Sequence, residues 1–300
     1  MTRPRPIFIS GRVRSGSTML WNIYNQAPGY RAFYQPCHDN LFPHIRYTAP
    51  MESHRGVSDY WGAYRDLGEG LEEAHRSEFG IARLLLESTD EHVALRDYIQ
   101  FLIDQCDDDE TPVLQFNAMC WRLPWLRAQF PDAHVVHLWR NPRDSWFSMI
   151  RHLPRELWDE PDLADAYDLL QWSVDLAPHF PFLFGEDVQT SYARTYLLWA
   201  LSRLAGEHCS DTVICFDDIQ GDPRSTLDRM VDSELLCKKA AKVAKKVIEP
   251  MPRGAWRAVH DDDWFTAIEE RGDALLDSLG LMEHFGLREL SSIRASHASA

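Results

Sequence analysis

The stretch ISGRVRSGSTMLWNI, residues 9–23, decides the fold of this 300-residue chain. In it Gly11 and Gly16 enclose four residues, and the hydroxyl residues Ser17 and Thr18 follow directly. An apolar run precedes the first glycine, and apolar residues recur at helical spacing after the second. This is the outline of a phosphate-binding loop, G-x-x-x-x-G-K-[ST], with serine at position 17 in place of the lysine. The stretch therefore predicts a strand, a tight turn and a helix.

The predicted turn is a candidate anion-binding site. Several backbone N–H groups of a strand–turn–helix point at one spot, and the helix N-terminus adds partial positive charge there. Arg14 adds a full positive charge and Ser15 a further hydroxyl donor. The missing lysine argues against ATP, although Asp217 and Asp218, at the end of the last predicted strand, are conceivable magnesium ligands of an ATP-dependent kinase. A serine–glycine turn that only caps a helix is the structural alternative.

Strands and helices alternate along the chain. Apolar runs predict buried strands at residues 6–10, 30–34, 111–118, 133–141 and 211–218. Helical apolar spacing and capping residues predict helices at 17–26, 92–105 and 191–205 and from Asn141–Pro142 onward. This alternation predicts an α/β fold with three layers, α/β/α, around a central and mostly parallel sheet. With no repeat and no Gly/Ser linker, residues 1–290 are expected to form one domain, followed by a disordered tail at 291–300.

The composition excludes several classes of partner. The formal net charge of −15 argues against nucleic acid and anionic membranes. No apolar run approaches the ~20 residues that span a bilayer, and no signal peptide is recognisable, so a cytoplasmic location is expected. Six scattered cysteines without a C-x-x-C pair predict neither a metal site nor a disulfide framework. The oligomeric state is left open.

A second candidate anion site lies in VVHLWRNPRDSWFSMIRH, residues 135–152. A buried strand is expected to end at Arg140, and Asn141 followed by proline is typical of a helix N-terminus. Helical spacing then places Ser148 on the helix face that lies near the end of the strand, where Arg140 emerges. Arg140 and Ser148 are therefore predicted to bind one phosphate, the arginine through its two-pronged guanidinium and the serine through its hydroxyl.

Together the two sites resemble those of the PAPS-dependent sulfotransferases, and in particular soluble bacterial members with a P-loop-like fold. That family has a basic residue followed by S-G-[ST]-T, and an R-x7-S element; residues 14–18 and the pair Arg140 and Ser148 match them. The segment ICFDDIQGDP, 214–223, is similar to the family's Y-E-D-L…D-P, and PRGAWR, 252–257, to its R-K-G-x-x-G-x-W loop.

The resemblance implies a donor, its product and the residues that hold them. The donor is 3′-phosphoadenosine 5′-phosphosulfate (PAPS), the product is PAP, and no metal is required. The implied donor-binding residues are Arg14, Ser15, Gly16, Ser17 and Thr18 at the 5′ end, and Arg140, Ser148, Arg253 and Gly254 at the 3′-phosphate. A donor with a sulfuryl group in place of the β- and γ-phosphates needs neither the Walker lysine nor magnesium.

The implied chemistry needs a cation on the leaving phosphate and a base for the proton of the acceptor. Arg14 is the expected cation, because a guanidinium stays charged and stabilises the leaving oxygen. Family members often carry glutamate followed by proline after the second strand as the base, but Gln35 stands at that position here. His38 is the candidate base, with Asp39 as the next to test, and an ordinary loop histidine is the alternative.

The acceptor is expected to be a small molecule, bound by insertions at about 37–90 and 153–190. Five aromatic residues of the second insertion either line an aromatic or apolar pocket or pack in the core: Trp158, Trp172, Phe180, Phe182 and Phe184. All lysines of the chain fall within 238–246, which predicts a solvated helix face, with contact to the donor as the alternative. Two other functions remain open, an ATP-dependent kinase and a non-catalytic relative that binds PAP.

Overall fold

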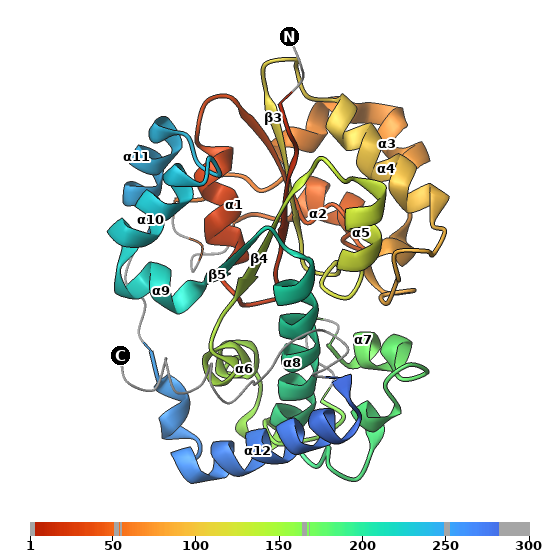
Figure 1. Cartoon of the computed structure of the whole chain (residues 1–300), viewed down its shortest axis with the longest axis vertical. Coiled ribbons are helices and arrows are strands. Elements are labelled where there is room, and N and C mark those ends of the chain that lie inside the picture. Colours follow the sequence, from red (N-terminus) through yellow and green to blue (C-terminus); the bar gives the residue numbers. More distant parts are fainter. Residues whose placement is uncertain are drawn as a thin grey trace.

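The computed structural model describes residues 4–50, 54, 56–163, 167, 169–248 and 253–281. Its centre is a five-stranded sheet in the order β2-β3-β1-β4-β5, and all four pairings are parallel. The strands are β1 (Ile7–Ser10), β2 (Tyr30–Tyr34), β3 (Thr111–Phe116), β4 (His134–Trp139) and β5 (Thr212–Cys215). Because β1 lies in the middle, the 11–16 loop leaves the sheet at its centre (Figure 1).

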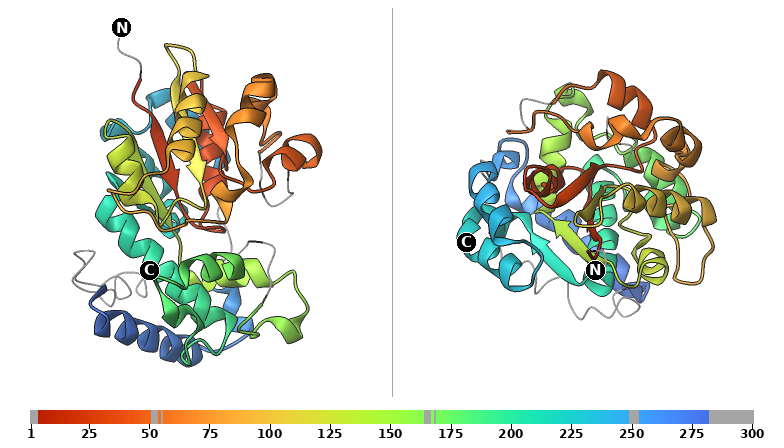
Figure 2. Two further views of the ribbon diagram at one scale, coloured as in Figure 1. Left: turned by 90° about the vertical axis from the view of Figure 1, so that its right-hand side faces the viewer. Right: turned by 90° about the horizontal axis from the view of Figure 1, so that it is seen from above.

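Helices cover both faces of this sheet, as the predicted three-layer α/β fold requires (Figures 1 and 2). On one side lie α1 (Ser17–Asn25), α9 (Phe216–Gly221), α10 (Pro223–Asp232) and α11 (Lys238–Val247). On the other side lie α2 (Leu41–Tyr47), α3 (Gly68–Ala74), α4 (Val93–Asp104) and α5 (Leu123–Gln129), together with the 3-10 helices η1 (Gly62–Leu67) and η2 (Ser77–Gly80).

A second group of helices lies beyond the carboxyl ends of the strands (Figure 1). It consists of α6 (Pro142–Ile150), η3 (Arg155–Leu157), α7 (Leu169–Leu176), η4 (Pro181–Phe184), α8 (Ser191–Cys209), η5 (Ala255–Ala258) and α12 (Asp262–Ser278). Two clusters of buried apolar side chains correspond to the two groups. The sheet core includes Phe8 and Leu114, and the helical core includes Trp146, Tyr192 and Phe265. The 11–16 loop lies where the two cores meet, since Ile9 belongs to the first and Val13 to the second.

The end of the last strand differs from its prediction. The run 211–218 was expected to be extended throughout, but β5 ends at Cys215 and Phe216 begins helix α9. Asp217 and Asp218 lie in the first turn of that helix, where carboxylates are stabilised by the partial positive charge of the N-terminus. These two acids favour a helix start over a longer strand.

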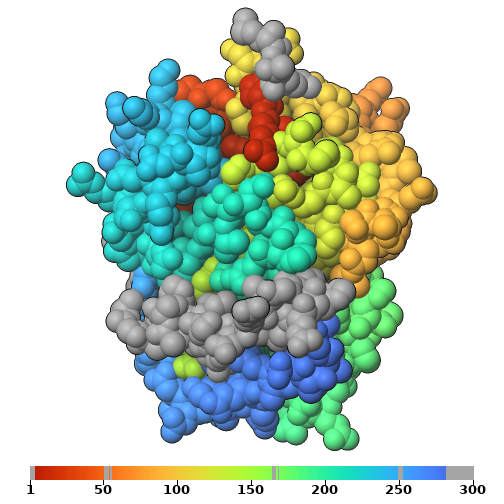
Figure 3. Space-filling model, in the orientation of Figure 1, coloured from red at the N-terminus to blue at the C-terminus, as the bar shows by residue number. Residues whose placement is uncertain are grey.

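The lysine-rich segment forms α11, and its exposure confirms the predicted solvated face. All five lysines are exposed, whereas Ala240, Ala244 and Val247 are buried against the neighbouring elements. The helix packs against α1 and α10 and forms part of the outer surface, at the upper left of Figure 3. The predicted tail at 291–300 lies outside the described residues. No helix in the described part is long and apolar enough to cross a membrane.

Candidate functional site

The 11–16 loop can adopt its path only because two positions are glycine. Gly16 is the N-cap of α1 and has φ 93°, in the left-handed region that favours glycine. A Cβ atom there would lie 2.1 Å from the ring of Phe216, which therefore packs directly beneath the loop. A Cβ at Gly11 would lie 2.8 Å from the carbonyl oxygen of Leu138 on β4. The first loop is thus pressed against β4 and against the start of α9.

The two predicted anion sites meet in space. Arg14, at the turn of the loop with φ 63°, donates a hydrogen bond from Nε to the hydroxyl of Ser148 on α6, at 2.9 Å. The Nη1 atom of Arg140, at the end of β4, lies 3.5 Å from the carbonyl oxygen of Arg14. Three residues that the sequence placed in separate motifs therefore form one cluster.

Arg140 is a buried cation that is short of hydrogen-bond partners. Its side chain is almost fully buried, at 7% exposure, and its guanidinium lies 5.2 Å from the centre of the Phe216 ring. Burial lowers the pKa of Arg140, and the nearby carboxylates of Asp144 and Asp217 act in the opposite direction. Within the described residues, Nε of Arg140 and the hydroxyl of Ser15 are buried without a partner. Such groups fit an anion, because an unpaired buried donor costs free energy until an acceptor reaches it.

The remaining hydroxyls of the loop contact neighbouring strands. The hydroxyl of Ser17 lies 3.4 Å from Oδ1 of Asn117, which also accepts a hydrogen bond from the amide of Gln115 at 2.9 Å. The hydroxyl of Thr18 is 2.8 Å from that of Tyr34, at the end of β2. The loop is therefore tied to β3 and β2 as well as to β4.

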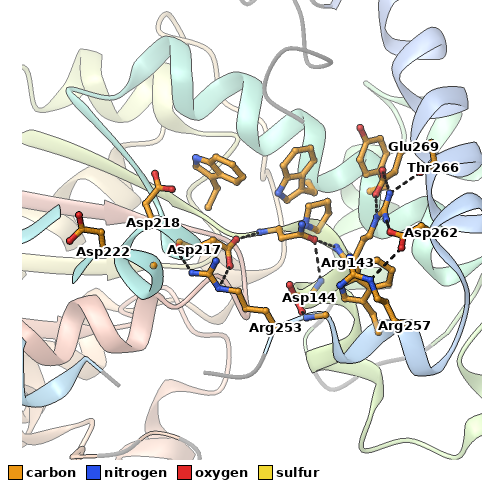
Figure 4. Close-up of a pocket in the computed structure, with 18 of the residues that line it drawn as sticks. Arg143, Asp144, Asp217, Asp218, Asp222, Arg253, Arg257, Asp262, Thr266 and Glu269 are labelled. Carbon is orange, nitrogen blue, oxygen red and sulfur yellow. Dashed lines mark hydrogen bonds and ion pairs between the residues drawn. The ribbon is translucent and has the colours of Figure 1, made fainter. Parts of the chain in front are cut away.

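Arg253 and Gly254 are fixed to the same end of β4. The guanidinium of Arg253 donates to the carbonyl oxygen of Asp217 and lies 3.9 Å from its carboxylate. The backbone N–H of Gly254 donates to Asp144 at 3.0 Å, and that of Asn141 donates to Asp217 at 2.9 Å (Figure 4). Arg253 and Gly254 are thereby held next to the turn that carries Arg140.

A cavity of about 1150 Å³ opens beside this segment (Figure 4). The first turn of α6, the α9–α10 turn, η5 and α12 line it. On one wall, Arg143 forms paired hydrogen bonds of 2.8 Å with Glu269 and a further bond of 2.8 Å with Asp262. These ion pairs join α6 to α12 and so fix the helix that carries Ser148.

His38, the predicted base, lies in a cluster of histidines. Its Nδ1 is 2.8 Å from the carboxylate of Asp39, and its ring packs on that of His44 at 4.3 Å. Its carbonyl oxygen lies 3.1 Å from Nε2 of His75. Burial lowers the pKa of His38, and the carboxylate of Asp39 opposes that shift. Among the described residues, no hydrogen bond or ring contact joins His38 to the 11–18 loop.

Two residues beside Arg14 were not singled out by the sequence. The ring of Tyr167 lies 5.8 Å from the guanidinium carbon of Arg14. Burial, and then the positive charge of Arg14, lower the pKa of His54 to about 4. They belong to the two segments that were expected to bind the acceptor. Neither residue falls in a motif, and its position depends on long-range packing, so no local pattern could have identified it.

Two further predictions concerned the aromatic residues of the 153–190 insertion and the conceivable magnesium ligands. Trp172 and Phe180 are buried in the helical core, which favours packing over a pocket wall, whereas Phe184 is 45% exposed. The carboxylate of Asp217, a conceivable magnesium ligand, instead accepts a hydrogen bond from the backbone N–H of Asn141 and lies 3.9 Å from the guanidinium of Arg253. In the described ranges, no group of three or more histidine, cysteine or acidic residues is arranged to hold a metal ion.

The parallel sheet, with its first loop and the end of its fourth strand meeting at one point, defines a P-loop-like α/β protein. A sequence model of the sulfotransferase family matches residues 6–182, which is more than half of the chain. The chain therefore belongs to the sulfotransferase family.

Solved structures of sulfotransferases are also similar to this one. The sulfotransferase from Alicyclobacillus acidocaldarius is 18% identical, with a TM-score of 0.43, and the match covers 98% of this chain and 100% of that one. The sulfotransferase STF9 from Mycobacterium avium is 14% identical over 93% of this chain and 77% of its own, with a TM-score of 0.47. A sulfotransferase domain from the curacin biosynthetic pathway is 15% identical, with a TM-score of 0.42. That match covers 92% of this chain and 99% of the domain. A search of curated proteins found no significant match.

Proposed function

We propose that this sulfotransferase transfers the sulfuryl group of PAPS to a hydroxyl group, or as a second choice an amine, of a small-molecule acceptor. The observation that carries the proposal is the cluster of Arg14, Arg140 and Ser148, in which a buried guanidinium retains an unpartnered Nε. A buried arginine of this kind suits a phosphate, which a guanidinium binds through two parallel hydrogen bonds. Family membership supports the same reaction class.

The proposed donor would use both halves of the cluster. Backbone N–H groups of the 11–16 loop and the start of α1 would hold the 5′ phosphosulfate, together with the hydroxyls of Ser15, Ser17 and Thr18. Arg140 and Ser148 would bind the 3′-phosphate. Arg253 and Gly254, fixed beside Arg140 through Asp217 and Asp144, would close over that phosphate. ATP lacks a 3′-phosphate and would leave Arg140 without this partner.

Sulfuryl transfer resembles phosphoryl transfer, in which positioning and charge stabilisation supply most of the catalysis. The acceptor oxygen forms a bond to sulfur while the bond from sulfur to the 5′-phosphate oxygen breaks. Arg14 would stabilise the negative charge that the leaving oxygen gains. The proton of the acceptor needs a base from the 37–90 segment. The sequence suggests His38, but among the described residues its side chain makes no hydrogen bond or ring contact with the 11–18 loop.

Calorimetric titration with PAP and with Mg-ATP tests the donor site. We expect micromolar binding of PAP without added metal, and no comparable binding of Mg-ATP. Arg140→Ala should weaken PAP binding by about 10- to 160-fold, because hydrogen bonds to a charged group are worth roughly 1.5–3 kcal/mol. AMP, which lacks the 3′-phosphate, should bind the wild type and this variant alike. Arg96→Ala, which removes an exposed arginine of α4, is the matched control.

The outcomes separate the candidate functions. Binding of Mg-ATP alone would favour the kinase and contradict the proposal. Binding of PAP without transfer of labelled sulfate from PAPS to any of a panel of phenols, alcohols and amines would favour a non-catalytic relative. Transfer to one class of the panel would identify the acceptor chemistry.

A further inference from the structure

A second histidine of the 37–90 segment, His54, is connected to the phosphate-binding loop through two tyrosines. Its Nδ1 lies 2.5 Å from the hydroxyl of Tyr60. The ring of Tyr60 stacks on that of Tyr34 with centroids 4.8 Å apart and planes 17° from parallel. The hydroxyl of Tyr34 contacts that of Thr18 at 2.8 Å. Both tyrosine rings are buried, so this chain of contacts holds His54 at a defined place relative to the loop.

The charge of Arg14 reaches this group of residues. After burial, it is the second cause of the lowered pKa of His54, which falls to about 4, and it also acts on Tyr34. The surroundings of His38 are different. The groups that shift the pKa of His38 are its burial and Asp39, and its neighbours are His44 and His75. Of the two histidines, His54 is therefore the one on which the charge of Arg14, the residue expected to stabilise the leaving group, acts.

Because residue 35 is a glutamine, the general base for the acceptor must come from another part of the chain. Gln35 follows β2 and its side chain hydrogen-bonds to the hydroxyl of Tyr34, so it lies within the same cluster. A neutral amide cannot take a proton from a hydroxyl. His54 approaches this cluster from the other side, through Tyr60, and a histidine can accept a proton near neutral pH.

From these contacts we infer that His54 is the general base that takes the proton of the acceptor hydroxyl. The inference rests on the proposed sulfuryl transfer and assigns to His54 the role that the sequence gave to His38. In the tautomer whose Nδ1–H donates to the hydroxyl of Tyr60, the lone pair of Nε2 is left for the proton of the acceptor. As the acceptor oxygen bonds to sulfur, its proton passes to Nε2 and the sulfur–oxygen bond of PAPS breaks. The imidazolium then releases the proton to water, so the products are the sulfate ester, PAP and H⁺.

The positive charge of Arg14 would make this base respond to the donor. His54 is neutral but a weak base, because its burial and then the charge of Arg14 disfavour protonation. The negative charges of the bound phosphosulfate offset that of Arg14. Proton affinity at His54 then rises toward the range in which general bases are most effective at neutral pH.

The placement of His54 can be tested without turnover. We would record NMR titrations of the histidine ring carbons in the wild type, Arg14→Gln and Arg14→Lys, and assign signals with His54→Gln and His38→Gln. In Arg14→Gln the pKa of His54 should rise toward 6.5, the ordinary value, while that of His38 stays the same. Arg14→Lys, which keeps the charge, should resemble the wild type. An unchanged His54, or a shift of His38 in its place, would overturn the inference whether or not the protein binds PAP.

Its role is tested by transfer of labelled sulfate from PAPS to the best phenol or alcohol of the acceptor panel. His54→Gln should lower kcat/KM about 100-fold or more, as removal of a general base does, and leave PAP affinity within about 2-fold. His38→Gln should retain turnover across pH 6 to 9. The opposite pattern would return the role to His38 and contradict the inference. A wild type without any transfer would instead contradict the proposed function, and the NMR result on His54 would still stand.

Discussion

At the scale of single residues, Gly16 and Phe216 explain how the 11–16 loop and Arg140 are held in fixed positions relative to each other. The ring of Phe216 fills the space that a side chain at position 16 would need. The same ring lies 5.2 Å from the guanidinium of Arg140. One aromatic side chain therefore supports both the turn expected to bind the 5′ end of the donor and the arginine expected to bind its 3′-phosphate.

Gly16→Ala should therefore damage stability and anion binding together. The left-handed φ of 93° costs alanine roughly 1–2 kcal/mol, and the clash with the Phe216 ring adds roughly 1–3 kcal/mol of overpacking. The control is Gly29→Ala, where φ is 84° but nothing lies within 4 Å of the added Cβ. Urea denaturation and PAP titration of both variants separate the two costs. Equal losses of stability would contradict the role given to Phe216.

The residues expected to bind the donor could be predicted because their relations are local. Arg140 and Ser148 are separated by two helical turns, and Asn141 caps that helix by accepting hydrogen bonds from Arg143 and Asp144. Spacing and capping rules are sufficient for such a pair. The neighbours of Arg14 are different. His54 approaches it from 40 positions further along the chain, after β2 and an insertion, and no spacing rule covers that distance.

At the scale of elements, β4 and α8 pack with a polar side chain between them. His137 of β4 is fully enclosed, at 1% exposure, and a Cβ at Gly206 of α8 would lie 2.2 Å from its ring. Both ring nitrogens lack a hydrogen-bond partner within the described residues. Burial, and then the charge of Arg203, lower the pKa of His137 to about 3. The contact of β4 with α8 thus requires a neutral histidine.

This requirement predicts a loss of stability in mild acid. The unfolded chain binds a proton at His137 below pH ~6.5, whereas the folded chain does so only near pH 3. Between these values the unfolded state holds more protons, so stability falls as pH falls, by up to ~1.4 kcal/mol per unit. We expect His137→Leu to remove this contribution to the pH dependence of the free energy of unfolding between pH 6.5 and 5, as measured by urea denaturation. His208→Leu, on the exposed side of α8, should keep the wild-type slope.

The elements themselves were largely predictable, because four of the five strands are apolar runs bounded by turn residues. The strand predicted at 30–34 matches β2, and the other three differ by a few residues at their ends. Of the run at 211–218, only Thr212–Cys215 forms a strand, since Asp217 and Asp218 suit the start of a helix better than the end of a strand. α2 was not predicted, because a helix of seven residues with only Leu41 fully buried is too short to give a clear periodic pattern.

At the scale of the whole molecule, the sheet core and the helical core are joined by α8. This helix contacts α5 and β4 on the sheet side and α6 and α12 on the other. The ion pairs of Arg143 connect α6 to α12 within the helical core, and Glu269 also accepts a hydrogen bond from the hydroxyl of Tyr192 on α8. A helix shared by both cores is expected to couple their unfolding.

Unfolding of the chain should therefore be a single cooperative transition, and a change in the helical core should shift all of it. Arg143 forms ion pairs of 2.8 Å with the buried carboxylate of Glu269 and the exposed carboxylate of Asp262. Substitutions of these two acids can therefore be compared directly. Glu269→Gln should cost roughly 3 kcal/mol, because it leaves a buried charge short of its partner. Asp262→Asn should cost less than about 1 kcal/mol, because water screens the exposed carboxylate.

Tryptophan fluorescence and far-ultraviolet circular dichroism check this in one urea titration. Most buried tryptophans lie in the helical core, among them Trp146 and Trp172, whereas circular dichroism follows all the helices. Coincident curves that move together in Glu269→Gln are expected for one domain. If the fluorescence transition alone moved to lower urea, the two cores would unfold separately. The site formed by Arg14, Arg140 and Ser148 would then lie at the junction of two domains, where closure around a ligand is common.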